Sequence, residues 1–96
     1  YNPTDGSVKL AIGADQVEKP NGIALSPDGG TLYVAENNNT PNGRMTLNAF
    51  TIHGDGSLGP KKVIVDFGAE AGIDGMTIDV QGNIYAAVRS TIASVL

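Results

Sequence analysis

The sequence contains no cysteine, which excludes disulfides and thiolate metal sites and favours a reducing compartment such as the cytoplasm. Basic residues are scarce too: six Lys and Arg stand against ten Asp and Glu, so the formal charge is −4. They cluster only at Lys61 and Lys62, too little positive charge for a phosphate backbone, and we expect no nucleic-acid partner. Apolar runs fall far short of the roughly 20 residues that a membrane helix needs, so no membrane segment is predicted.

Helical periodicity is also missing. The sequence instead has thirteen Gly and five Pro, which punctuate short β-branched and aromatic runs. It therefore predicts an all-β fold, with one helical turn at most, at 69–71. The expected strands are 7–12, 22–26, 31–36, 44–52, 62–67, 75–80, 83–88 and 91–96.

Several of these strands are apolar on both faces. Ile23 and Leu25 share one side of their strand, while Ala24 lies on the other. A strand with two apolar faces must lie between two layers, which an isolated open sheet cannot provide. Within 44–52 the apolar positions change from odd to even numbers, which predicts a bulge or twist near Ala49.

An internal repeat organises the chain. Residues 21–35, NGIALSPDGGTLYVA, align with residues 74–87, DGMTIDVQGNIYAA. Each unit has a strand that begins with glycine, a tight turn, a second strand centred on tyrosine, and two further strands. Four short strands in a repeat of about 40 to 50 residues are typical of a β-propeller blade.

This pattern divides the chain into parts of three four-stranded antiparallel blades. We expect residues 1–18 to end one blade, residues 19–67 to form a complete blade, and residues 73–96 to start the next. Neither end looks like a natural terminus. We therefore expect the 96 residues to be a piece of a longer protein, or a unit that pairs with copies of itself.

Asn21 and Asp74 hold equivalent positions in the repeat, each directly before a glycine at the head of a first strand. In a propeller these strands lie nearest the central channel, where the two side chains would converge. An amide oxygen and a carboxylate form part of an oxygen site for a hard cation such as Ca²⁺ or Mg²⁺. The alternative is that Asn-Gly and Asp-Gly are ordinary turn dipeptides.

Other residues attract weaker interpretations. Tyr33 and Tyr85 repeat in register, and we expect both in the core of their blades. His53 is the single histidine and is interpreted as a solvated turn residue. Asn38-Asn39-Thr40 fits the N-glycosylation sequon, a pattern that often occurs by chance.

Three motifs in this order resemble the gluconolactonase family that includes senescence marker protein and regucalcin. They are KPNGIALSPDGGTLYVAE at 19–36, DGSLG at 55–59 and IDGMTIDVQGNIYAA at 73–87. The resemblance implies a six-bladed propeller with a divalent cation in its channel and an enzyme that hydrolyses sugar lactones. It also implies that Asn21 and Asp74 are metal ligands. The family's glutamate ligand would lie upstream of Tyr1, and neither Glu36 nor Glu70 stands at a repeat position that could replace it.

The expected function is therefore metal-dependent hydrolysis of a small-molecule sugar lactone. Ca²⁺ is the first expectation for the cation, with Mg²⁺, Mn²⁺ and Zn²⁺ as alternatives. Asp74 would also be catalytic, as the group that accepts the proton of the attacking water. The remaining blades, or other copies, are needed to close the ring. Two alternatives stay open: a non-catalytic propeller scaffold, and a seven-bladed phosphogluconolactonase-type enzyme, which 47–60 also resembles.

Overall fold

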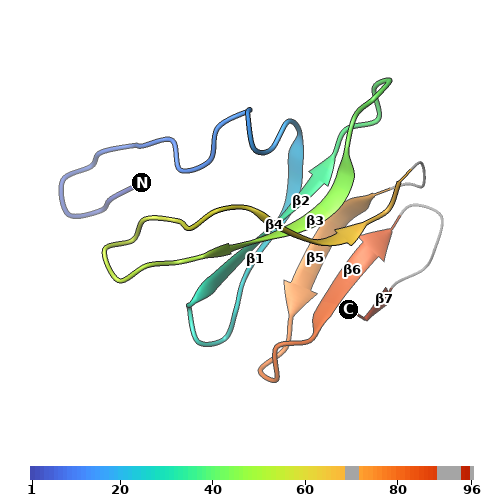
Figure 1. Cartoon of the computed structure of the whole chain (residues 1–96). Coiled ribbons are helices and arrows are strands. Elements are labelled where there is room, and N and C mark those ends of the chain that lie inside the picture. Colours follow the sequence, from blue (N-terminus) through green and yellow to red (C-terminus); the bar gives the residue numbers. More distant parts are fainter. Residues whose placement is uncertain (69–71, 89–93, 96) are drawn as a thin grey trace.

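The computed structural model describes residues 1–68, 72–88 and 94–95, which fold into two antiparallel sheets (Figure 1). The first sheet has the order β1 (Pro20–Leu25), β2 (Thr31–Asn37), β3 (Met45–Thr51) and β4 (Lys62–Asp66). The second has the order β5 (Ile73–Ile78), β6 (Ile84–Val88) and β7 (Ser94–Val95). The all-β class and the four-stranded antiparallel sheet are as predicted. Nothing in the described part of the chain is a helix able to cross a membrane.

The β1–β2 and β5–β6 hairpins are closed by turns of the same design. Gly29 and Gly82 both have a positive φ, of 71° and 89°, which glycine adopts without steric cost. A carboxylate braces each turn: the Asp28 Oδ1 accepts from the Gly30 N–H at 2.9 Å, and the Asp79 Oδ1 accepts from the Asn83 N–H at 2.8 Å. Side-chain bonds of this kind are why Asp is common in turns.

The main hydrophobic core lies between the two sheets. Its buried residues are Ala35, Leu47, Ile73, Ile84, Ala86 and Val88. A smaller core covers the opposite face of the four-stranded sheet, where Val34 and Phe50 pack with Val17 from the segment that precedes β1. The four-stranded sheet therefore has apolar packing on both faces, as its sequence predicted.

The apolar positions of β3 change parity because each parity faces a different core. Leu47 is buried in the main core and Phe50 in the smaller one. The β2–β3 pairing runs without interruption, but the pairing with β4 shifts between Leu47 and Asn48. The extra residue at this shift is Ile64 of β4, so β3 itself has no bulge near Ala49, and the prediction of one from the change of parity was wrong.

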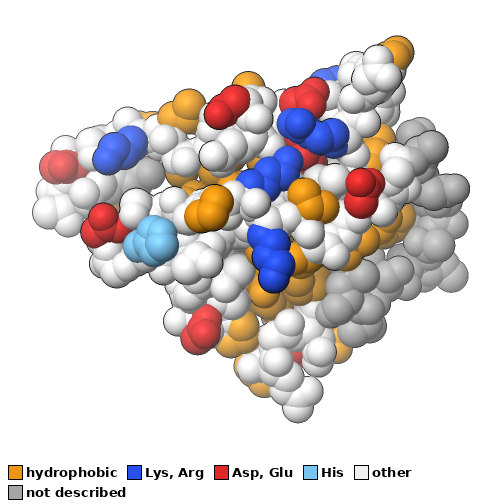
Figure 2. Space-filling view, in the orientation of Figure 1, with side chains coloured by type: hydrophobic (Ala, Val, Ile, Leu, Met, Phe, Trp, Pro, Cys, Tyr) orange, Lys and Arg blue, Asp and Glu red, His pale blue; other side chains and the backbone are white. Residues whose placement is uncertain are grey.

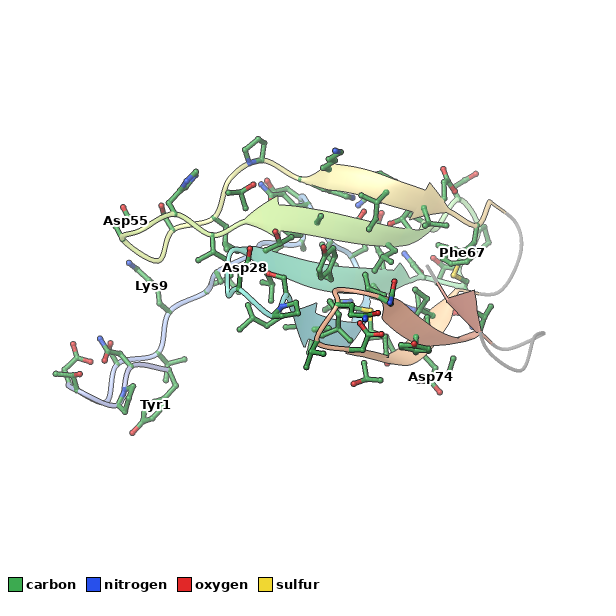
Figure 3. All side chains as sticks on the ribbon, turned by 90° about the horizontal axis from the view of Figure 1, so that it is seen from below. Tyr1, Lys9, Asp28, Asp55, Phe67 and Asp74 are labelled. Carbon is green, nitrogen blue, oxygen red and sulfur yellow. The ribbon has the colours of Figure 1, made fainter. Side chains whose placement is uncertain are left out.

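Two other expectations differ from the structure. Residues 7–12 form no strand, and Val8 and Leu10 are each 83% exposed, because no described strand lies alongside to pair with them. Figure 3 shows Tyr1 and Lys9 away from both sheets. Tyr33 packs against the main core, but Tyr85 is exposed, since it projects from the face of β6 that is turned away from that core. The expected turn at 69–71 and most of the expected strand at 91–96 lie outside the described residues.

Candidate functional site

The heads of β1 and β5 border a hollow of about 440 Å³, which we call the Asn21–Asp74 pocket. It is lined by Asn21, Asn37, Asn39, Gly72, Asp74, Ala87 and Val88. Figure 3 shows Asp74 at one end of the molecule and the turn residues Asp28 and Asp55 at the other. The two residues that the repeat paired thus line one pocket, although they come from different sheets.

Irregular strand pairing sets the position of both side chains. The β1–β2 register shifts between Pro20 and Ile23, and the β5–β6 register shifts between Ile73 and Met76. Asn21-Gly22 and Asp74-Gly75 lie within these two irregularities. Bulges of this kind bend a strand and redirect a side chain, and they are frequent beside active sites.

Gly22 allows β1 and β5 to approach each other closely. A Cβ at Gly22 would lie 3.2 Å from the Asp74 carbonyl oxygen and 3.3 Å from the Met76 Cγ. Contacts this short are tighter than most side chains make, so a larger residue would require the neighbouring strand to shift by a few tenths of an ångström. The Asn21-Gly22 motif therefore places a polar side chain beside Asp74 and also lets the two strands meet.

Asn37 and Asn39 also line the pocket, and sequence reasoning did not assign them to it. Asn37 ends β2 and Asn39 lies just after it, and this end of β2 is beside the start of β1 because the two strands are antiparallel. The antiparallel pairing expected of the first two strands could have predicted this position, because it brings the end of the second strand beside the start of the first. From the sequence, residues 38–40 were interpreted only as a sequon.

The chemistry of the pocket suits a hard cation but supplies only part of a site. Among the described residues that line it, the polar side chains are one carboxylate and three carboxamides, and none is Lys or Arg. Oxygen donors of this kind match Ca²⁺ or Mg²⁺, which take about six or more ligands. No group of three or more His, Cys, Asp or Glu that could hold a metal occurs among the described residues. Asn21 and Asp74 could therefore supply only two of the ligands that such a cation needs.

The sequon asparagine has a structural role. Asn38 is buried, and its Nδ2 donates to the Glu18 Oε2 at 2.7 Å. Its Oδ1 accepts from the Thr40 hydroxyl at 2.7 Å, which holds the loop that follows β2. The nitrogen that glycosylation would modify is therefore engaged inside the fold, while Asn37 and Asn39 on either side of it border the pocket.

A second polar group, which we call the Glu36 cluster, comprises Glu18, Glu36, Arg44, Thr46 and Lys61. Glu36 is fully buried. Its Oε2 accepts from the Arg44 Nη2 at 2.9 Å and from the Glu18 N–H at 2.8 Å. Its Oε1 accepts from the Thr46 hydroxyl at 3.0 Å and the Lys61 Nζ at 3.1 Å. Figure 2 shows acidic and basic side chains side by side near the centre of one face.

These bonds decide the charge state of Glu36. Burial alone raises its pKa, but hydrogen bonds from Arg44, the Glu18 N–H, Lys61 and Thr46 outweigh burial and lower the pKa from 4.5 to about 2. Glu36 is therefore a structural carboxylate, which agrees with its exclusion as a metal ligand. Glu70 lies outside the described residues, and His53 is exposed, as expected of a turn residue.

Two comparisons with known proteins each find a match, and both matches are of the gluconolactonase kind. Residues 2–94 match the family described as the SMP-30/Gluconolactonase/LRE-like region. The fold is similar to a gluconolactonase from Xanthomonas campestris, described as important in glucose secondary metabolic pathways, with 33% sequence identity and a TM-score of 0.59. That similarity covers 72% of this chain and 21% of the Xanthomonas chain, so the chain spans about a fifth of its relative. No curated protein matches the chain.

Proposed function

The chain belongs to the SMP-30/gluconolactonase/LRE-like family, and from that premise we propose that the complete protein hydrolyses a sugar lactone with the help of a divalent cation. The observation that carries this proposal is the Asn21–Asp74 pocket, in which the two residues that resemble the family's ligands line one hollow. Its volume of about 440 Å³ falls within the range usual for small-molecule sites, roughly 300 to 1,000 Å³.

The proposal includes the rest of the fold. Residues 19–67 correspond to one blade, residues 1–18 to the end of the preceding blade, and residues 73–96 to the start of the next, in a ring of six closed by further blades or copies. Ile23 and Leu25 of β1 are 64% and 51% exposed, on the face that a preceding blade would cover. Closing the ring would bury this apolar surface and so stabilise the protein.

In this proposal Asn21 and Asp74 hold the cation, with Ca²⁺ as the first candidate and Mg²⁺, Mn²⁺ or Zn²⁺ as alternatives. A divalent cation, when bound, polarises a carbonyl and lowers the pKa of a water. Asn21 contributes a neutral oxygen that fixes position. Asp74 contributes negative charge and accepts a proton from the water that attacks the lactone carbonyl carbon. The ring C–O bond then breaks, and the ring oxygen takes up a proton to give the hydroxy acid.

The two alternatives have less support. Neither match points to a seven-bladed phosphogluconolactonase type, since the family and the structural relative are both of the gluconolactonase kind. A non-catalytic scaffold would have no need of a carboxylate and three carboxamides around one pocket. A metal response separates the scaffold from the enzyme directly.

We expect Asp74→Ala in the complete protein to abolish metal-dependent lactone hydrolysis, because it removes both the anionic ligand and the proton acceptor. Turnover of a gluconolactone is measured in a pH-stat with Ca²⁺, Mn²⁺ or Zn²⁺ and with EDTA. Asp28→Ala, which removes a carboxylate at the opposite end of the molecule, is the matched control and should retain activity.

Thermal unfolding accompanies the assay. The cation should stabilise the wild type, by about 2.7 kcal/mol at a concentration 100 times its Kd, and should not stabilise Asp74→Ala. Unchanged turnover in Asp74→Ala would refute the assignment of this residue. A complete protein that responds to none of the metals would favour the scaffold.

A further inference from the structure

Asn37, the last residue of β2, connects the two strands that carry Asn21 and Asp74. Its backbone N–H donates to the carbonyl oxygen of Lys19, the residue that precedes β1 and lies two positions before Asn21, at 2.9 Å. Its side-chain Nδ2 donates to the Ile73 carbonyl oxygen at 3.2 Å. Asn37 is half-buried and lines the pocket, so a single residue is bonded to both sides of it.

The bond to Ile73 acts on the backbone of Asp74. The Ile73 carbonyl and the Asp74 N–H belong to one planar peptide group, so a hydrogen bond to the carbonyl restrains the plane that leads into Asp74. The next peptide group is packed close to β1, because the Asp74 carbonyl oxygen lies 3.2 Å from where a Cβ on Gly22 would be. Asp74 is thus held on its N-terminal side by Asn37 and packs closely against Gly22 on its C-terminal side.

We propose that Asn37 is a positioning residue that fixes the Asp74 carboxylate relative to the Asn21 amide. The expected consequence, a higher metal affinity of Asn21 and Asp74, rests on the proposed function. The geometric part concerns the chain alone: the Asn37 amide sets the orientation of the peptide group between Ile73 and Asp74. Residues that orient metal ligands through a hydrogen bond commonly change metal affinity about 10- to 100-fold when they are replaced.

The test compares Asn37→Leu with Asn39→Leu in the complete protein. Leucine has the same number of side-chain heavy atoms and the same branching as asparagine, with a larger volume, and it removes the donor. Asn39 lines the same pocket, and no bond from its side chain to β5 is found in the described part of the chain. Calorimetric titration with Mn²⁺ should show at least about tenfold weaker binding for Asn37→Leu and a loss at least about threefold smaller for Asn39→Leu, which changes the pocket wall without touching the bond to Ile73. The melting temperature of Asn37→Leu should fall by no more than about 4 °C.

A second measurement does not depend on the metal. Labelling with ¹³C-carbonyl isoleucine and ¹⁵N-aspartate selects peptide groups between Ile and Asp, which in this chain are Ile73–Asp74 and Ile78–Asp79. Loss of the Asn37 hydrogen bond should shift the Ile73–Asp74 signal and leave the Ile78–Asp79 signal unchanged. Asn39→Leu should shift neither signal.

The outcomes separate this proposal from the proposed function. Wild-type Mn²⁺ affinity in Asn37→Leu, or an unshifted Ile73–Asp74 signal, overturns the positioning role even if the enzyme is an active lactonase. Equal loss of affinity in Asn37→Leu and Asn39→Leu also overturns it, because the effect would then belong to the pocket wall. If the wild type binds no metal, the proposed function fails, and the labelled signals alone decide whether Asn37 orients Asp74.

Discussion

The Glu36 cluster and the Asn21–Asp74 pocket are each built around one carboxylate, and the two carboxylates differ in every other respect. Glu36 is fully buried, and both of its oxygens accept bonds from two cations, a hydroxyl and a backbone N–H. Asp74 is exposed at a pocket, and no bond to its carboxylate is found within residues 1–68, 72–88 and 94–95. A carboxylate whose bonds are all made inside the fold stabilises that fold, whereas one at a pocket can serve a ligand.

Replacing Glu36 should give the largest change in stability. Glu36→Gln removes the negative charge but keeps the volume, and it leaves Lys61 and Arg44 without their buried counter-charge. Removing one partner of a buried ion pair costs about 3–5 kcal/mol. Because Arg44 and Lys61 are 42% and 17% exposed and Arg44 keeps its ion pair with Glu18, the cost here should lie at the lower end, about 3 kcal/mol. The free energy of unfolding, measured in urea on the complete protein, should fall by that amount.

The matched variant for this comparison is Asp74→Asn. Its free energy of unfolding should stay within about 0.5 kcal/mol of the wild type, because the side chain is exposed. If Asp74→Asn were the more destabilising of the two, the assignment of one carboxylate to structure and the other to function would be wrong.

The pH dependence of stability should give a change of similar or slightly smaller size. The pKa of Glu36 is about 2 in the folded protein against 4.5 as its ordinary value. Because the folded value is lower, its contribution is fully present above pH 4.5 and is lost as the pH falls toward 2. This loss amounts to about 3 kcal/mol.

Urea midpoints recorded between pH 7 and pH 2.5 test this prediction. The wild type should lose more stability below pH 4.5 than Glu36→Gln, whose curve should be flatter over the same range. Parallel curves for the two proteins would show that the Glu36 cluster does not set the acid sensitivity.

A glycine substitution at the pocket should lower stability by less than the loss of the Glu36 carboxylate does. Gly22→Ala places a Cβ 3.2 Å from the Asp74 carbonyl oxygen, so β1 and β5 must move apart slightly. Crowding of this kind costs about 1–3 kcal/mol. Chemical denaturation of the complete protein measures the cost.

Gly54→Ala is the control, at an exposed position where an added Cβ meets no described atom within 4 Å. It should be neutral or stabilising by up to about 1 kcal/mol, since alanine restricts the unfolded chain. Equal costs at Gly22 and Gly54 would contradict the close approach of β1 and β5.

Much of this architecture could be predicted from the sequence because it depends on local patterns. Alternating apolar residues and Gly-containing turns indicated the strands from 22 to 88, although their ends differ by up to two residues. The pairing of Asn21 with Asp74 came from the repeat, and both residues line one pocket. Residues 7–12 failed as a strand because alternation describes only which side a residue faces, whereas a strand also needs a neighbour to bond to.

The contributions of Asn37 and Glu36 could not be predicted because they depend on contacts between distant segments. The Asn37 side chain bonds to Ile73 in the other sheet, and Glu36 meets Lys61 of the segment before β4. Glu36 and Asn37 are adjacent, so they share the same sequence context, and that context could not show that their roles differ. Their side chains project to opposite faces of β2, one toward β5 and the other toward the segment before β1.

The Asn21–Asp74 pocket can form only after distant parts of the chain have met during folding. Its polar residues come from β1, from β2 and the loop after it, and from β5, so its walls meet only through contacts between distant parts of the chain. Such contacts form slowly compared with hairpins, because a long loop must close first. A growing chain that has been synthesised only as far as β4 already holds every residue of the Glu36 cluster but has no Asp74 to face Asn21. Binding at this pocket would therefore report that the second sheet has docked.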